Sequence, residues 1–131
     1  MANEAVCIEN PTKFARYTIA ASAIPKYSLL QISSDPNTAT ISSGDGDVFG
    51  GIAMEETTVL GGMTQISAAL DGVWDLKAST DAVTLGAMCV ISGVNLIRPA
   101  VAADLLTGAT FCKALETGDA SEVIRVRLGL N

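Results

Sequence analysis

Residues 65–97 contain a succession of short β-prone segments separated by turn-forming residues. Ile66, Ala68 and Leu70 occupy alternate positions, the period of a half-buried strand. Asp71-Gly72 then enters a tight turn or bulge, because glycine accepts a positive φ, and β-type residues resume around Trp74. Short strands with frequent turn signals predict a β-sandwich or barrel. We therefore expect the rest of the chain to pack around this meander.

The second half of this region predicts two further strands. Val83 to Ile91 is almost continuously apolar, contains β-branched residues, and is stopped by Ser92-Gly93. Its nine residues suit a strand buried on both faces better than a helix, although periodicity alone does not separate the two. The next strand is expected to begin at Asn95.

Other segments carry clearer local signals. Val123–Leu128 alternates apolar residues with two arginines, so one face should be buried and the other solvated. The paired glycines Gly50 and Gly51 interrupt a strand, which predicts a bulge or a close backbone approach. Residues 101–106 form the best helical candidate, with Gly108 as its C-terminal stop. The residues expected in the core are Met88, Val90, Ile124, Val126 and Leu128.

The composition limits the classes of partner. The chain has 131 residues, which favours one domain, and only 17% of them are charged. So few charges predict that part of the surface is covered by other chains, as in an oligomer or a docked subunit. A net charge of −6 without a Lys/Arg cluster argues against nucleic acid. No apolar run reaches the ~20 residues of a membrane helix, and no secretion leader is recognisable.

Catalytic and metal sites find little support in the residue types. The chain has no histidine, which removes Ser-His and Cys-His nucleophile pairs and the commonest metal ligand. Asp71 and Asp75 flank the tryptophan and could form a glycosidase pair, but no second element of a site is visible. Asp45-Gly46-Asp47 favours a solvated hairpin loop over a calcium site, because the later ligands and a closing Glu are missing. The three cysteines, an odd number at wide spacing, are expected to be buried free thiols of a reducing compartment. We expect no cofactor and no metal.

Residues 1–23 differ from the remainder of the chain. Within them, Lys13, Phe14, Arg16 and Tyr17 combine basic and aromatic side chains in a β-prone segment. Two interpretations are open: an extended arm that binds a neighbouring chain by strand addition, or an ordinary first strand of the barrel. On the arm interpretation these four residues form the partner-binding set, and residues 24–131 form the barrel domain.

Several of these segments together resemble the capsid cement, or decoration, proteins of tailed bacteriophages. The similar segments are Ile24-Pro25-Lys26 before Leu29-Leu30, Gly46–Ala53, Leu70–Trp74, Val83–Met88, and Gly118 before Val123–Leu128. The resemblance covers most of the chain from about Ile24 onward. One departure is Tyr27, at a position where a glycine is expected after the lysine.

The resemblance implies a mainly β fold: a small β-tulip-like barrel or sandwich with an extended N-terminal arm and at most one short helix. It implies a non-enzymatic structural virion protein, assembled in the host cytoplasm. Such a protein would form homotrimers on the outer surface of the phage head. There it would bridge major capsid protein subunits and stabilise the expanded capsid. Two alternatives are a β-barrel subunit of the phage neck or tail and a small carboxylate-dependent glycan hydrolase.

Overall fold

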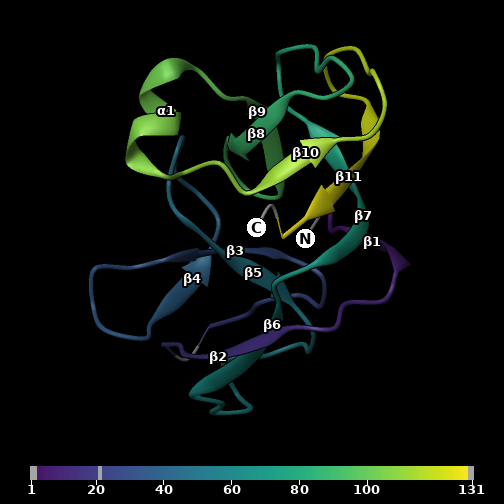
Figure 1. The fold of residues 1–131 in the computed structure, drawn as a ribbon. Helices are drawn as coiled ribbons and strands as arrows, with labels where there is room; N and C mark the ends of the chain where they lie inside the picture. The colour runs from purple at the N-terminus through teal and green to yellow at the C-terminus, as the bar shows by residue number, and fades with distance from the viewer. Residues whose placement is uncertain (1–2, 21, 130–131) are drawn as a thin grey trace.

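The fold is mainly β with one short helix, as the sequence predicts (Figure 1). It is seen in a computed structural model that describes residues 3–20 and 22–129. The strands are β1 Val6–Glu9, β2 Phe14–Thr18, β3 Leu29–Ile32, β4 Ala39–Ile41, β5 Phe49–Ala53, β6 Gln65–Ala69, β7 Gly72–Ala78, β8 Met88–Ile91, β9 Leu96–Pro99, β10 Cys112–Ala114 and β11 Val123–Leu128. The helix α1 spans Ala102–Thr107.

The first sheet is closed into a barrel. Its strand order is β1-β7-β11-β10-β8-β9, and a parallel pairing of β9 with β7 closes the ring from β7 to β9. β1 and β9 share one edge of β7: β1 pairs along Val73–Asp75 and β9 pairs at Lys77 and Ala78. Five strands therefore form the ring, and β1 extends it at one side.

The second sheet lies below the first in Figure 1 and has the order β2-β6-β5-β3-β4. An isolated bridge between Thr18 and Thr38 brings its two terminal strands together at one point. The sequence predicts a β-barrel or sandwich packed around one meander; the structure has a closed five-stranded barrel, and strands β2 to β6 form a second sheet. The chain leaves the first sheet after β1 and returns to it at β7.

The inner strands β3 and β5 of the second sheet carry buried apolar residues on both faces. Leu29 and Ile52 belong to the core of the barrel, while their neighbours Leu30 and Ala53 belong to a separate cluster on the other face. All four are fully buried. Consecutive apolar residues are therefore required in β3 and β5, since alternate side chains of a strand point to opposite faces.

Most local predictions are confirmed. In β11 the apolar residues are buried and the arginines exposed, so the predicted phase is correct. Met88 is only half-buried, whereas Val90 is completely buried. The helix ends at Gly108, which adopts a left-handed φ of 72°. The Gly50-Gly51 pair lies at a register shift opposite β3, as expected of a bulge.

The predicted nine-residue strand Val83–Ile91 is wrong in its first half. Val83 makes an isolated bridge to Gly118, and the chain then turns through Gly86, whose φ is +87°. Only Met88–Ile91 forms a strand, β8. The prediction failed because apolar residues occupy the turn as well as the strand. The side chain of Leu85, in the turn, is exposed at the surface.

Tyr27 adopts a conformation that favours glycine. Its φ is +70°, a region that aromatic residues rarely enter. The Tyr27 N–H donates to the carbonyl of Ala53 at 2.7 Å, and its ring makes an edge contact with Trp74, centroids 5.6 Å apart. The expectation of a glycine here agrees with this backbone, and packing of the ring offsets its strain.

Polar contacts join the two sheets. Asn95 accepts a hydrogen bond from the Leu29 N–H at 2.8 Å through Oδ1, and its own N–H donates to Ser42 Oγ at 3.0 Å. Arg98 lies between Asp45 and Asp104, with N–O distances of 2.7 and 2.8 Å. Asp45 thus contributes to a structural ion pair. Within the described residues, no helix has the length and hydropathy needed to cross a membrane.

Candidate partner-binding surface

The N-terminal segment supplies an outer strand to each sheet. β1 pairs with β7 in the first sheet, and β2 pairs with β6 in the second. The proposed arm of residues 1–23 is therefore integrated into the chain's own sheets; its residues 1, 2 and 21 lie outside the described part. The outer strands of a sheet are the ones that can accept another chain. A role of this segment in binding a partner is therefore compatible with the fold, and it stays a prediction.

The side chains of β2 alternate between solvent and interior. Phe14 and Arg16 are exposed on one face, and Phe14 retains 55% of its accessible surface. Tyr17 points to the opposite face and packs against the core cluster of the second sheet. Burial raises the pKa of its phenol. Of the four residues predicted to contact a partner, Lys13, Phe14 and Arg16 lie at the surface, whereas Tyr17 also serves the interior.

The backbone of β2 presents an unpaired edge. The Lys13 carbonyl accepts a bond from Leu70 N–H, and Ile19 N–H donates to Thr64, so the odd-numbered residues face β6. The antiparallel register therefore directs the N–H and C=O groups of Phe14 and Arg16 away from the sheet. Even-numbered Thr18 uses this same edge, because its N–H donates to the Asn37 carbonyl at 2.8 Å.

Asp71 fixes the connection that leads into β2. Its Oδ1 accepts the N–H groups of Thr12 and Lys13 at 2.7 and 3.0 Å, and Oδ2 accepts the Thr12 hydroxyl. These hydrogen bonds, led by that of the Thr12 side chain, lower the pKa of Asp71, because they favour the charged carboxylate. The β6–β7 turn thereby holds a segment that is distant in sequence.

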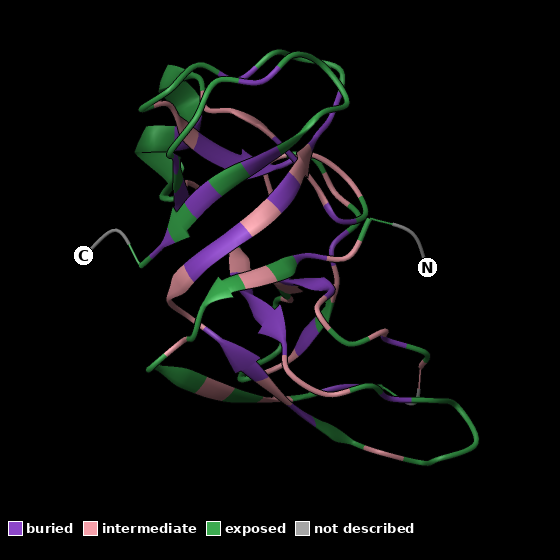
Figure 2. Ribbon diagram, turned by 90° about the vertical axis from the view of Figure 1, so that its right-hand side faces the viewer, coloured by how far each residue is buried: buried purple, intermediate pink, exposed green. Residues whose placement is uncertain are grey.

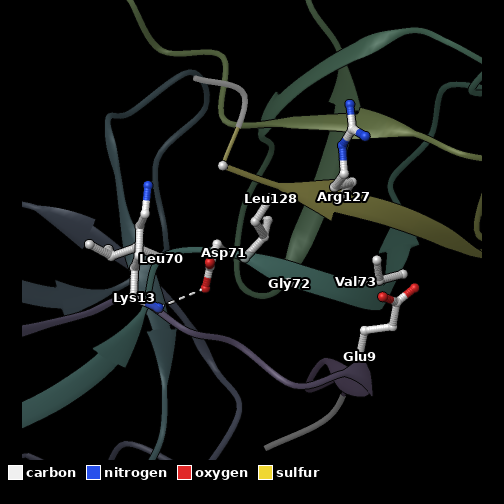
Figure 3. Close-up of a pocket in the computed structure, with 9 residues that line it drawn as sticks. Glu9, Lys13, Leu70, Asp71, Gly72, Val73, Arg127 and Leu128 are labelled. Atoms are coloured by element: carbon white, nitrogen blue, oxygen red, sulfur yellow. Dashed lines mark hydrogen bonds between the residues drawn. The ribbon is translucent and has the colours of Figure 1, made fainter.

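A hollow of about 420 Å³ lies beside this contact. It is lined by Glu9, Lys13, Leu70, Asp71, Gly72, Val73, Arg127, Leu128 and Gly129. Figure 3 shows the Asp71 carboxylate turned toward the Lys13 backbone, while the side chains of Lys13 and Arg127 extend away from it. Neither cation makes an ion pair within residues 3–20 and 22–129. Both residues are exposed.

The carboxylates considered as a glycosidase pair have structural partners. Asp71 holds the β1–β2 connection, and Asp75 pairs with Arg125 at 3.1 Å between β7 and β11. In the described part of the chain, no three His, Cys, Asp or Glu side chains gather in a way that could hold a metal ion.

Two of the three thiols face each other inside the barrel. Cys89 on β8 and Cys112 on β10 are partners in the strand register and are fully buried, whereas Cys7 is partly exposed. Burial raises the pKa of the Cys112 thiol well above its usual range. Cys112 thus contributes as a small apolar core residue.

Helix α1 has an exposed apolar surface that the sequence analysis did not identify. Val101, Leu105 and Leu106 retain 58%, 59% and 89% of their accessible surface, and Figure 2 shows the helix as mostly exposed. Asp104 instead points inward and binds Arg98. The sequence contained one signal for this surface, because Asp104 is the only ionisable side chain in helix α1. In the structure, the ion pair of Asp104 with Arg98 fixes which face of the helix turns inward.

Comparison with known proteins identifies a similar fold without a sequence relative. No family model matches the chain, and no curated protein matches it. Among solved structures it is similar to one described as the head fiber gp8.5 N base in bacteriophage phi29. The TM-score is 0.55 at 14% identity, with 89% of this chain and 93% of the other covered. The likeness therefore extends over nearly the whole of both chains and establishes a shared fold.

Proposed function

We propose that this chain is a structural protein of a phage head. The observation that carries the proposal is the fold shared with a head fiber base over 89% of the chain. The residue content agrees with it: no histidine, few charges and exposed apolar side chains on β2 and α1. These features favour a surface that binds other proteins over a catalytic site.

In its specific form, the proposal is a decoration or cement protein on the outer surface of the capsid. It binds the major capsid protein, bridges neighbouring subunits and stabilises the expanded shell. It acts as a homotrimer and without enzymatic activity. Its partner-binding residues are Lys13, Phe14 and Arg16, with Tyr17 supporting β2 from the inner face.

Co-sedimentation with purified phage heads tests this function. The protein should sediment with expanded heads and raise the temperature at which they release DNA. Unexpanded heads and tails are the controls. Electron microscopy of the complexes should place the protein on the head, whereas density confined to the neck or tail would favour the alternative structural role. No binding to any virion part would refute the proposal.

The trimer and the non-enzymatic role need their own measurements. Light scattering should give three times the chain mass of 13.5 kDa, either in solution or after release from heads. A monomer under both conditions would contradict the trimer. Glycan hydrolysis that disappears in both Asp71→Asn and Asp75→Asn variants would contradict the non-enzymatic role.

A further inference from the structure

The unpaired edge of β2 is suited to accept a strand from another chain. β2 is a terminal strand of the second sheet, and the register leaves the N–H and C=O groups of Phe14 and Arg16 directed outward. A peptide strand that docks there can form up to four backbone hydrogen bonds, because each outward residue offers one donor and one acceptor.

The side chains beside this edge favour an apolar and acidic strand. Phe14 is 55% exposed and would pack against a cross-strand neighbour. Arg16 bonds to Gln65 Oε1 at 2.8 Å and Ser67 Oγ at 3.0 Å, which holds its guanidinium over the sheet with donors to spare. Lys13 adds a second positive charge at the start of the strand. Pairing of two β2 edges with each other would bring these like charges together, which disfavours a second copy bound edge to edge.

We propose that the Phe14–Arg16 edge of β2 accepts an extended segment of the capsid shell protein, one that carries a carboxylate and an apolar side chain. The proposal rests on the function proposed above and names the contact. It differs from a detached arm, since β2 remains in its own sheet and supplies the acceptor edge. The sheet is then extended across the boundary between two proteins.

A proline at position 16 separates this contact from the stability of the fold. Arg16→Pro removes an N–H that faces outward, a position at which edge strands tolerate proline. Arg16→Ala removes the same side chain and keeps the N–H. Both variants should melt near the wild-type temperature. By contrast, Ala15→Pro removes an N–H that faces β6 and should destabilise the sheet.

The expected result is that Arg16→Pro binds expanded heads roughly 5- to 100-fold more weakly than Arg16→Ala, since a lost hydrogen bond leaves a desolvated acceptor. Equal affinity of the two variants, with wild-type binding intact, would overturn this inference and leave the proposed function standing. A wild-type protein that does not bind heads would overturn both.

Hydrogen exchange of the wild-type protein gives an answer even if Arg16→Pro does not fold. The amides of Phe14 and Arg16 should exchange rapidly in the free protein and become protected on heads. The amide of Ala15, already paired with β6, is the internal control and should be protected in both states. Amides at 14 and 16 that stay unprotected on heads would refute the strand contact. Protection that appears in the free protein as its concentration rises would identify a second copy as the occupant.

Discussion

Truncation of Val126 to alanine tests the packing of the barrel. Val126 is completely buried on β11 and belongs to the main core cluster, where the strand register places it between Trp74 and Ala114. The change removes two buried methyl groups, worth about 0.8 kcal/mol each. The cavity left behind adds a comparable amount, so the expected loss is about 2–3 kcal/mol of the free energy of unfolding.

For a domain of this size, such a loss lowers the melting temperature by about 6–12 °C. Thermal unfolding followed by circular dichroism measures it, with denaturant unfolding as the independent estimate. Arg127→Ala is the matched control on the same strand, because this side chain points to solvent and its removal should cost less than about 0.5 kcal/mol. Val126→Asp would bury an unpaired charge and should leave the barrel unfolded. If Val126→Ala and Val126→Asp both melted like the wild type, the assigned face of β11 would be wrong.

Two further substitutions test the β6–β7 turn and the bulge in β5. Asp71→Asn should lower stability at neutral pH, and the difference from wild type should shrink as pH falls. This sign follows because the folded-state pKa of Asp71 is lowered, so its contribution is present above the unfolded value of about 3.9 and disappears as the pH passes below the folded one. Melting temperatures between pH 7 and 3 measure it, and a constant difference would contradict it. Gly51→Ala should cost about 2–4 kcal/mol, because φ is +137° and the new Cβ would lie 2.6 Å from that of Ala68. Gly62→Asn, at φ +62° with no atom within 4 Å of the added Cβ, is the control and should melt close to wild type.

The elements predicted correctly are those whose signal lies within a few residues. Alternation alone assigned the buried face of Val123–Leu128, and the glycine stop placed the end of α1 within one residue. Where an apolar run contained a turn, as at Leu85-Gly86, the same rules failed. A hydrophobic residue can be buried in the core or exposed at a surface. The hydropathy of a leucine in a surface turn therefore does not distinguish it from a leucine in a strand.

Contacts between distant segments could not be predicted, because no local pattern specifies them. The Asp71 carboxylate was considered for catalysis, yet it binds Thr12, 59 residues away along the chain. Likewise, the division into two sheets depends on β1 pairing with β7 and not with β2. For the candidate surface, the sequence predicts a partner-binding role for the basic and aromatic residues around Phe14, and this stays a prediction. The open edge beside them depends on the register of β2 against β6 and became visible only in the structure.

The insertion of strands β2 to β6 between β1 and β7 has a consequence for biosynthesis. β1 leaves the ribosome before the second sheet, and its pairing partner β7 is translated only after it. During this interval β2 to β6 can pair among themselves, since all their ladder contacts lie within the emerged segment. Closure of the barrel then brings together β1 and β7, which are separated along the chain by the whole second sheet. Among the described strands, β1 is thus translated before all the others, although it pairs only once β7 has been made.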